Sequence, residues 1–510
     1  MQAPQPMRAL VLTALALLAG ESGALVPAQS AGSKPLYFTT QQDHFDGSNY
    51  NTWQQAYYIN DTYWKGPDSG APVFVCVGGE GPALTGEVLI ASPHCNNAVE
   101  WLPEVGALMF AVEHRYYGCH NASACPVDDV SAPGALKFLS SRQALGDLVA
   151  FHGFATQEYG LTAANRWVSW GGSYPGMLAG WLRLKFPNLV HAAVASSAPV
   201  QAQVDMVGYN DVVAYAYSAT SVGGSDACLE AIASGHKTIG DLMNGSDADR
   251  EYLGSVFDIR DPSRFKVKSY QASFAGNGVA NFPAQSNEPT CTSPACNVDK
   301  ICQLMTNTTL GTDVERLAQV RKAQSFLGAD AVNGVKEQRL EMHARPPTKR
   351  TGAMASAFEP DYWYYQTCTE FAFYQTCEVG SKCMFTQGLV TLDGYLDSCQ
   401  SSFGITAEEV AQNVAYTNEY YGGSEPAGTR VMWPNGEVDP WQALSVLVQP
   451  NREQPIMMVT GASHHAWTHP SAPTDSPELV QAREAIRKQV AEWLKEDDDD
   501  VGVAAKTAAY

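Results

Sequence analysis

Residues 167–176, with the sequence WVSWGGSYPG, constrain the fold of this chain more than any other segment. An apolar run leads through two glycines and Ser173 into a stretch with helical spacing, which is typical of a sharp turn from a strand into a helix. Glycines beside such a turn remove Cβ atoms that would clash. Pro175 replaces the second glycine of a G-x-S-x-G pattern, and proline is tolerated in the first helical turn. The segment predicts a nucleophile elbow at Ser173, and a Gly-rich strand end without catalysis is the other interpretation.

Short apolar runs alternate with longer stretches of helical spacing along much of the chain. The runs predicted as buried strands are residues 72–77, 107–112, 166–170, 192–195, 429–433 and 456–460. The stretches predicted as helices are residues 140–159, 174–186, 314–327 and 477–494. Strands that alternate with helices pair in parallel and are joined by crossovers, so the sequence predicts an α/β fold.

Residues 206–404 differ in character from the segments around them. They hold eight of the twelve cysteines, loops rich in proline and asparagine, and helical patches. We therefore expect a mostly helical, disulfide-containing insertion (cap) domain, which splits the α/β core into residues 36–205 and 405–494. The last residues, 495–510, begin with an acidic run, and a solvated, disordered tail is the favoured interpretation.

The N-terminus has the features of a secretory signal peptide over residues 1–24. Arg8 precedes eleven mostly apolar residues, 9–19, and small residues follow at 22–24, where a signal peptidase could cut. Eleven helical residues span only about 16 Å, which is too short for a hydrocarbon core of about 30 Å. We therefore expect a product of the secretory pathway without stable membrane insertion.

All twelve cysteines lie beyond the signal segment, which fits an oxidised, disulfide-bonded product. They could form six bridges, but the sequence does not determine the pairing. Cys76 lies inside a predicted buried strand, and we expect that it could stay a free thiol. Four Asn-x-Ser/Thr sites are candidates for glycosylation: Asn60, Asn121, Asn244 and Asn307.

No pattern of metal ligands stands out in the sequence. The nearest one, Cys291, Cys296 and Cys302, has spacings that suit disulfide-stapled loops better than a tetrahedral zinc site. Neither H-E-x-x-H nor a paired C-x-x-C occurs. We therefore expect no metal and no cofactor.

The charge balance excludes one class of partner. The chain has 53 acidic and 32 basic residues, and this formal charge of −21 repels phosphate backbones, so no nucleic acid is expected as a partner. Protonation of all eleven histidines would change −21 to −10 and would relieve this self-repulsion at low pH. The composition is therefore compatible with a lysosomal or endosomal lumen as well as with secretion.

Two later loops offer the partners that a nucleophilic serine needs. In α/β-hydrolases the acid and the base follow the serine in the order Ser, Asp, His, each after a later strand. Asp439 follows the predicted strand 429–433, and His464 and His465 follow the predicted strand 456–460. An aspartate before a proline is also a common turn residue, and a lone loop histidine usually faces solvent. The shared order and context favour a catalytic triad.

Several strings, in order along the chain, carry a resemblance to a known family. They are EHRYYG (113–118), GGSYPG (171–176), LKFP with ASSAPV (184–187 and 195–200), YQTCTEF (365–371), NGEVDPW (435–441) and GASHH (461–465). Over roughly residues 36–494 the chain resembles the lysosomal prolyl carboxypeptidase and dipeptidyl peptidase II family of serine peptidases. Residues 208–228 most resemble its thymus-specific serine protease branch. The resemblance implies an α/β-hydrolase with a helical insertion over the active site, and a serine exopeptidase, often of acidic compartments, that cleaves near proline or small residues.

The family motifs imply roles for residues at matching positions. Ser173 is the implied nucleophile, Asp439 the residue that orients the base, and His464 the base, since the family's histidine is the first after its glycine spacer. The family commonly has an aspartate three residues after that histidine, but this loop lacks it, so a base at His465 stays open. We expect His469 at the surface.

The loop after the strand at 72–77 lies where a second oxyanion-hole donor should come from. Tyr174 N–H would be the first donor, and the N–H of Gly79 or Glu80 the second, unless this loop is an ordinary Gly-rich turn. Glu80 and Glu113 could also bind a substrate terminus. For Glu113 a structural ion pair with its neighbours at 114–115 is the favoured interpretation.

Trp441, Trp363 and Trp467 offer flat faces against which a proline ring could pack, although an aromatic side chain is more often part of a core. The first hypothesis is a secreted or endolysosomal serine exopeptidase, of dipeptidyl peptidase or Pro-Xaa carboxypeptidase type, whose insertion admits short peptides. An esterase or lipase on the same triad and a non-catalytic peptide-binding protein on a hydrolase scaffold are the alternatives. Peptides are the expected partners, and the oligomeric state stays open, with a homodimer as one option.

Overall fold

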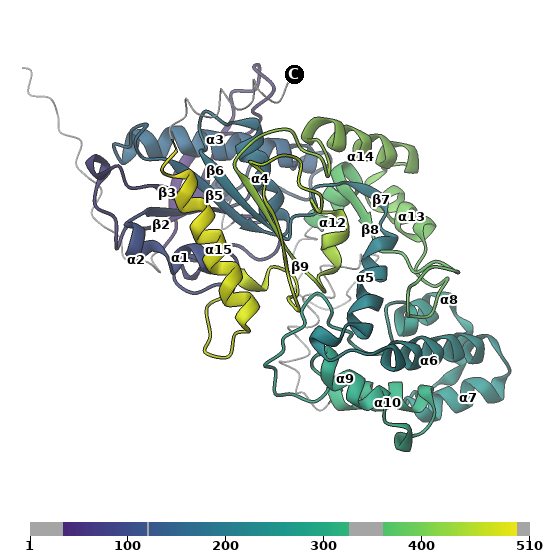
Figure 1. Cartoon of the computed structure of the whole chain (residues 1–510). Helices are drawn as coiled ribbons and strands as arrows, with labels where there is room; N and C mark the ends of the chain where they lie inside the picture. Colours follow the sequence, from purple (N-terminus) through teal and green to yellow (C-terminus); the bar gives the residue numbers. More distant parts are fainter. Residues whose placement is uncertain (1–33, 120–121, 326–360, 497–510) are drawn as a thin grey trace, which may run out of the picture.

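The computed structural model describes residues 34–119, 122–325 and 361–496 (Figure 1). The predicted signal peptide, residues 1–24, lies outside these described residues, as do Asn121 and most of the tail predicted at 495–510. Within the described part of the chain, no helix is both long and apolar enough to cross a membrane.

The centre of the molecule is an eight-stranded sheet with the strand order β1-β2-β4-β3-β5-β6-β9-β10. The strands are β1 (Leu36–Gln41), β2 (Thr52–Asn60), β3 (Val73–Val77), β4 (Leu108–Val112), β5 (Trp167–Gly172), β6 (Ala192–Ser196), β9 (Val431–Gly436) and β10 (Ile456–Val459). β2 runs antiparallel to both β1 and β4, and the other pairings in the sheet are parallel. The carboxyl ends of β3, β5, β6, β9 and β10 therefore meet at one rim of the sheet.

Helices cover both faces of the sheet, as a mainly parallel sheet requires. They are α1 (Asn96–Val99), α2 (Leu102–Val105), α3 (Ser141–Glu158), α4 (Tyr174–Lys185) and α15 (Pro477–Trp493). α3 and α4 share one hydrophobic core with Val75 of β3, whereas α1, α2 and α15 share the other with Phe74 (Figure 1). Adjacent residues of β3 enter different cores because side chains alternate along a strand.

The described residues between β6 and β9 form a mostly helical lobe beside the sheet (Figure 1). Its helices are α5 (Val207–Ser218), α6 (Asp226–Asn244), α7 (Asp247–Val256), α8 (Lys268–Gln271), α9 (Val298–Met305), α10 (Asp313–Ser325), α12 (Tyr362–Gln366), α13 (Leu392–Phe403) and α14 (Ala407–Tyr421). A separate parallel pair, β7 (Gln203–Asp205) and β8 (Ala372–Tyr374), joins the start of the lobe to its later part. α14 packs against α13 and Thr367–Phe371, so the lobe extends past residue 404.

The predicted fold class is confirmed: the protein is an α/β-hydrolase with a large helical, disulfide-containing insertion. Each predicted strand and helix overlaps an observed one. The hairpin of β1 and β2 was not predicted, because its buried residues include polar ones. Thr40 donates to Asp147 and Gln55 donates to the carbonyl oxygen of Glu113, and these partners lie far away in the sequence.

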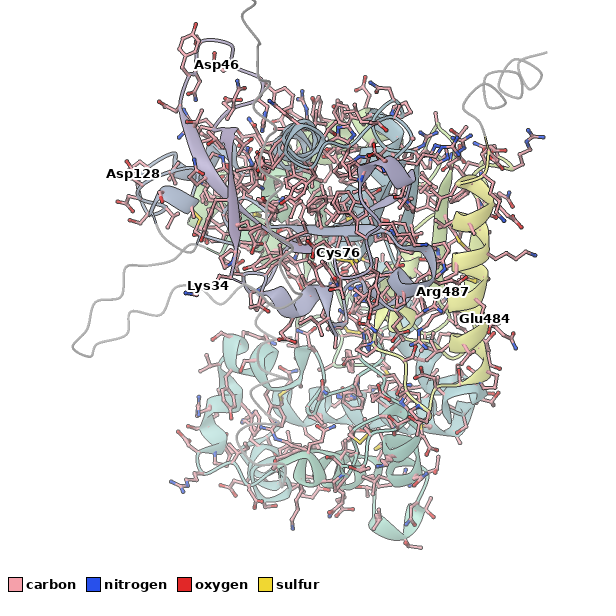
Figure 2. The ribbon with its side chains drawn as sticks, turned by 90° about the vertical axis from the view of Figure 1, so that its left-hand side faces the viewer. Lys34, Asp46, Cys76, Asp128, Glu484 and Arg487 are labelled. Atoms are coloured by element: carbon pink, nitrogen blue, oxygen red, sulfur yellow. A yellow bond between two sulfur atoms is a disulfide. The ribbon has the colours of Figure 1, made fainter. Side chains whose placement is uncertain are left out.

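Six disulfide bonds account for all twelve cysteines, as the sequence allowed. They are Cys76–Cys95, Cys119–Cys125, Cys228–Cys302, Cys291–Cys296, Cys368–Cys399 and Cys377–Cys383. The expectation of a free thiol at Cys76 is therefore wrong. Figure 2 shows Cys76 inside the core, well away from Glu484 and Arg487 on α15. From there it reaches Cys95, which directly precedes α1.

The four candidate glycosylation sites differ in their accessibility. Asn60 ends β2, is only 5% exposed, and donates its side-chain amide to the carbonyl oxygen of Leu89 at 2.9 Å. The folded protein does not present this amide to solvent, so the expectation at Asn60 conflicts with the structure. Asn244 and Asn307 are exposed, and glycosylation there stays a prediction.

Candidate active site

Ser173 lies at the turn between β5 and α4 in a backbone conformation that few residues adopt. Its φ is 63° and its ψ is −133°, and such strain is concentrated at functional sites. The glycines around it are required by close approach of the chain. A Cβ on Gly171 would lie 2.2 Å from the carbonyl oxygen of Pro175, and one on Gly176 would lie 2.7 Å from that of Ser196. The sequence thus folds here into the sharp turn of a nucleophile elbow.

Asp439 and His464 form a buried pair at the same rim of the sheet. Asp439 follows β9, is 0% exposed, and accepts the N–H of Trp441 at 3.0 Å. His464 follows β10, and its Nδ1 lies 2.9 Å from each carboxylate oxygen of Asp439. The carboxylate therefore holds the tautomer that carries its proton on Nδ1, which leaves Nε2 able to accept a proton.

His464 and Ser173 both line one cleft of about 910 Å³. His464 is 8% exposed, and its Nε2 has no hydrogen-bond partner among the described residues. The structure therefore brings the three predicted triad residues to one rim and pairs Asp439 with His464, but it contains no Ser173–His464 hydrogen bond. In enzymes without substrate this bond is often long and tightens only when substrate binds.

His465 is held differently from His464. Its Nδ1 lies 2.9 Å from Thr468 Oγ1, its N–H donates to Ser197 Oγ, and its ring packs against Gly172. Burial, followed by the charges of neighbouring imidazoles, holds the pKa of His465 well below its ordinary value. His464 is thus the imidazole that contacts the carboxylate of Asp439.

His469 was expected at the surface, but it is partly buried and lines the cleft. Its ring centroid lies 5.9 Å from that of His465, which in turn lies 4.5 Å from that of His464. The three imidazoles therefore form a row along the cleft.

The loop after β3 lies directly against the nucleophile elbow. A Cβ on Gly79 would lie 2.3 Å from Pro175 Cγ, so only glycine allows this approach. Tyr174 is the first residue of α4, and the N–H of such a residue has no partner within its helix. Tyr174 thus directly follows the serine, and the loop of Gly79 and Glu80 packs against the same turn; their roles as oxyanion-hole donors stay a prediction.

A buried polar network fixes the side chain of Tyr174. Burial lowers the pKa of His114 to about 4, so the ring is neutral. Its Nδ1–H donates to the carbonyl oxygen of Arg115, and its Nε2 accepts the hydroxyl of Tyr174 at 2.9 Å. Gln366 of α12 donates to the same hydroxyl at 3.0 Å and to Glu370 at 2.9 Å. The insertion therefore helps to hold the first residue of the elbow helix.

Glu113 is buried and does not line the cleft, which argues against contact with a substrate terminus. Its carboxylate accepts the N–H groups of Leu84 and His114, and burial raises its pKa to about 7. The ion pair expected with the adjacent Arg115 is wrong, because Arg115 forms a bidentate pair with buried Asp147.

Two residues that the sequence did not single out hold the loops that contain Asp439 and His464. Gln285, in the insertion, accepts the N–H of His464 with its carbonyl oxygen and the indole N–H of Trp441 with its side-chain oxygen. Glu437 accepts the N–H of Gly461 and the hydroxyl of Tyr215 on α5, each at 2.7 Å. The sequence gives one local indication of the role of Glu437, because its carboxylate lies two residues before Asp439 in the NGEVDPW string. It gives no such indication for Gln285.

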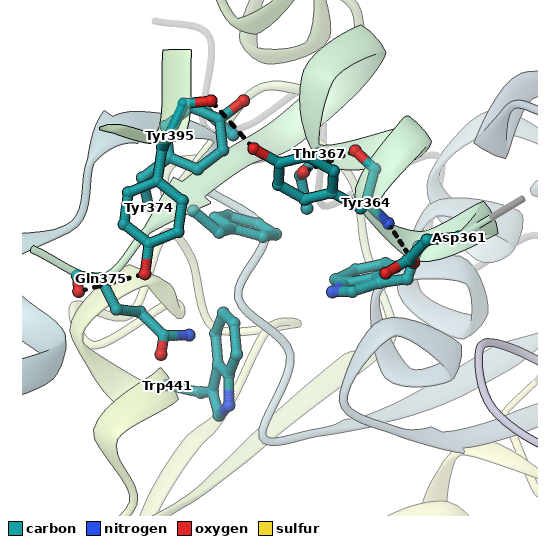
Figure 3. A pocket seen from close by; sticks show the side chains of 10 residues that line it. Asp361, Tyr364, Thr367, Tyr374, Gln375, Tyr395 and Trp441 are labelled. Carbon is teal, nitrogen blue, oxygen red and sulfur yellow. Dashed lines mark hydrogen bonds between the residues drawn. The ribbon is translucent and has the colours of Figure 1, made fainter. Parts of the chain in front are cut away.

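The three tryptophans proposed to pack against substrate have different positions. Trp441 and Trp363 line an aromatic cavity of about 40 Å³ (Figure 3). In Figure 3 the indole of Trp441 lies on one side of this cavity and Asp361 on the other. The Trp441 ring centroid lies 6.3 Å from that of His464, so the cavity adjoins the Asp439–His464 pair. Trp467 is 0% exposed and donates to Ser196, so the expected substrate contact there is wrong.

Comparisons with known proteins agree with the resemblance seen in the sequence. The family model for serine carboxypeptidase S28 matches residues 40–486. Thymus-specific serine protease of Mus musculus is 35% identical over 485 residues, covering 94% of this chain and 89% of that protein. The Homo sapiens protein of the same name is 33% identical over 490 residues, covering 92% and 88%.

A more distant relative and one solved structure complete the comparison. Lysosomal Pro-X carboxypeptidase of Mus musculus is 25% identical over 483 residues, covering 92% of this chain and 90% of that protein. The crystal structure of a proline iminopeptidase from Mycobacterium smegmatis aligns at a TM-score of 0.33 and 13% identity, over 90% of this chain and 97% of that one. Because the family model spans most of the sequence, the chain belongs to the serine carboxypeptidase S28 family.

Proposed function

We propose that the protein is a serine exopeptidase that cleaves short peptides near proline or small residues through an acyl-enzyme. The observation that carries this proposal is the buried Asp439–His464 pair beside the strained Ser173. Relatives that are named as serine proteases support the peptide bond, rather than an ester of another class, as the bond that is cleaved.

In the proposed reaction, His464 Nε2 takes the proton of the Ser173 hydroxyl as Oγ attacks the carbonyl carbon of the substrate. Asp439 keeps the imidazole oriented and stabilises the imidazolium that forms. The oxyanion is stabilised by the N–H of Tyr174 and by that of Gly79 or Glu80. The proton then passes from His464 to the leaving amine, and water releases the acyl group by the same steps.

The shape of the cleft supports action on short peptides or chain ends. Insertion residues 285–290 and the loop that contains Glu80 both line the cleft, so the insertion and the core enclose it together. Trp441 adjoins both His464 and the aromatic cavity, so it supports packing of a proline ring next to the scissile bond. Phe373, which also lines this cavity, has a φ of 63°, and such strain persists where the surroundings enforce it.

Six disulfide bonds support maturation in the secretory pathway. We propose secretion or residence in a lysosomal or endosomal lumen, with Asn244 and Asn307 as glycosylation sites. Glycosidase treatment followed by mass spectrometry of these two asparagines tests this location.

A fluorophosphonate probe tests the proposed chemistry directly. The wild-type protein should be labelled at Ser173, and Ser173→Ala should not be labelled. Mass spectrometry of proline-containing peptides digested between pH 4 and 8 should then show loss of a dipeptide from the amino end or of one residue from the carboxyl end. A well-folded wild type that is never labelled would favour the non-catalytic binding protein instead, and labelling with turnover of esters alone would favour the esterase.

A further inference from the structure

Gln285, in the insertion, is anchored at the cleft by three hydrogen bonds. Its carbonyl oxygen accepts the N–H of His464 at 3.1 Å, and its side-chain Oε1 accepts the indole N–H of Trp441 at 3.0 Å. The hydroxyl of Tyr209 on α5 donates to the same Oε1 at 2.9 Å. Gln285 lines the cleft together with Ser173 and His464. Its side chain is therefore held in one place at the cleft of the proposed nucleophile.

The partners of Oε1 determine how the amide of Gln285 is oriented. An indole nitrogen donates a hydrogen bond but never accepts one, so the atom that faces Trp441 is the amide oxygen. Tyr209 donates to the second lone pair of this oxygen. A flipped amide would set two donors against each other. The NH₂ group of Gln285 therefore lies on the other branch of the amide and cannot exchange places with the oxygen.

This NH₂ group has no hydrogen-bond partner in the described part of the chain, and Gln285 is partly exposed. An ordinary surface glutamine donates to water and changes rotamer freely, so a ligand that bound it would have to order it first. Gln285 differs, because Trp441 and Tyr209 already hold its oxygen. A side chain that is ordered before the ligand arrives loses less entropy on binding. The cleft thus contains one hydrogen-bond donor that is oriented in advance.

The amide of Gln285 lies where the cleft adjoins the aromatic cavity. Trp441, which contacts Oε1, lines that cavity, and Figure 3 shows its indole on one side of it. The ring centroid of Trp441 lies 6.3 Å from that of His464. The cavity is lined mostly by aromatic rings, and the proposed function places a proline ring in it. The donor on Gln285 is therefore close to the backbone of a proline that occupies the cavity.

A proline in this cavity has a distinct hydrogen-bonding character on the side of its nitrogen. Proline has no N–H, so the peptide bond that precedes it can only accept a hydrogen bond. The carbonyl oxygen of that bond, which belongs to the residue before the proline, lies about 2.3 Å from the ring nitrogen. The protein group that matches this oxygen is a donor beside the cavity, and the NH₂ group of Gln285 is such a donor.

We propose that Gln285 is a substrate-binding residue, whose Nε2 donates to the carbonyl oxygen of the residue before a proline held in the aromatic cavity. This inference rests on the proposed peptidase function and adds to it a residue that recognises the substrate backbone. A neutral amide takes no part in proton transfer, so Gln285 acts on the binding and orientation of the peptide. One hydrogen bond between neutral groups changes kcat/KM by about fivefold. Because the contact is to the backbone, it selects for the peptide bond before proline and not for a particular side chain.

Three forms of one hexapeptide that contains a single proline test this contact. The first form is the ordinary peptide. In the second, sulfur replaces the carbonyl oxygen of the residue before the proline, and in the third, sulfur replaces the carbonyl oxygen of the peptide bond furthest from the proline. Sulfur is a weak hydrogen-bond acceptor, so the wild type should cleave the second form with about fivefold lower kcat/KM than the first. It should cleave the third form like the first.

The variant Gln285→Glu tests whether Gln285 supplies the donor. At pH 7 the introduced carboxylate keeps an oxygen for Trp441 and Tyr209 but has no hydrogen to donate. The first form should therefore lose about fivefold in kcat/KM, expressed per fluorophosphonate-reactive serine, and the ratio of the first form to the second should fall to about one or less. Gln400→Glu, at an exposed position of α13, is the matched control and should keep the wild-type ratio. A purely structural role of Gln285 would lower cleavage of all forms equally and would leave that ratio unchanged.

Equal cleavage of the first two forms by the wild type, or an equally large loss for the third form, would overturn the inference while the peptidase function stands. An unchanged ratio in a folded Gln285→Glu protein would overturn it too. If no form is cleaved, the peptidase function fails, and calorimetry of the same peptides with Ser173→Ala then still decides the inference. Binding of the first form about fivefold tighter than the second supports it, and equal affinities refute it.

Discussion

Replacement of Asp439 by asparagine is the strongest test of the catalytic geometry. Asp439 is fully buried, and both of its oxygens lie 2.9 Å from Nδ1 of His464. An asparagine of the same shape keeps one acceptor oxygen for the N–H of Trp441, so the loop after β9 should persist. Its NH₂ group, however, favours the tautomer of His464 that carries the proton on Nε2. That imidazole cannot take the proton of Ser173.

The expected loss of kcat from this single change is large. In a Ser-His-Asp triad the same substitution lowers kcat about 10⁴-fold, because the histidine has the wrong tautomer and the imidazolium loses its counter-charge. Such a factor equals roughly 5.4 kcal/mol of transition-state stabilisation. The loss of one charged hydrogen bond should lower the free energy of unfolding by only about 1–3 kcal/mol.

The assay combines turnover with a count of active sites. Peptide cleavage is followed by mass spectrometry, and fluorophosphonate labelling shows how much serine still reacts. Asp241→Asn is the matched control, since Asp241 forms an exposed ion pair with Lys237 on α6, away from the cleft. A well-folded Asp439→Asn protein that keeps more than about a tenth of wild-type kcat would refute the assignment of the triad.

Three further predictions follow from the same structure. His464→Ala should abolish fluorophosphonate labelling, whereas His465→Gln should retain it, and the reverse result would make His465 the base. Burial raises the pKa of Glu113 to about 7, so the folded state keeps a proton that the unfolded chain releases above about 4.5. Stability should therefore fall by up to about 3 kcal/mol between pH 4.5 and 7, and thermal melts of Glu113→Gln should show a flatter pH dependence. Removal of the Cys228–Cys302 bridge, with a sequence separation of 74, should destabilise the insertion by about 4 kcal/mol in denaturant titrations. Removal of Cys291–Cys296, with a separation of 5, should lower the free energy of unfolding by about 2 kcal/mol, because a shorter loop restricts the unfolded chain less. Equal losses for the two bridges would contradict this dependence on loop length.

Local patterns in the sequence were sufficient to predict the elements that carry the proposed triad. β5, β9 and β10 are short apolar runs, and the residues after each run include Ser173, Asp439 and His464. A parallel sheet brings the ends of such strands to one rim, so the sequence predicted that these residues would meet. What it could not predict is that Nε2 of His464 has no hydrogen-bond partner among the described residues.

The predictions failed where a long-range contact decides the environment of a residue. Cys76 sits in an apolar strand, and nothing nearby in the sequence indicates that Cys95 will face it. Trp467 follows the histidine loop, where an aromatic side chain could contact a substrate. It is buried instead, because it packs in one core with α15 and its indole N–H donates to Ser196. In both cases the deciding partner comes from another layer of the fold.

The insertion lines the cleft, and it also contacts the loops that carry the proposed catalytic groups. Gln285 holds the backbone of His464, Tyr215 holds Glu437 and through it the loop at Gly461, and Gln366 holds Tyr174. His464, the proposed base, and Tyr174, the first residue of the elbow helix, each receive a contact from this lobe. Deletion of the insertion should therefore leave an α/β core without an ordered base, rather than an unselective hydrolase. The proposed function couples selectivity to catalysis, because the same loop, residues 285–290, lines the cleft and contacts the backbone of His464.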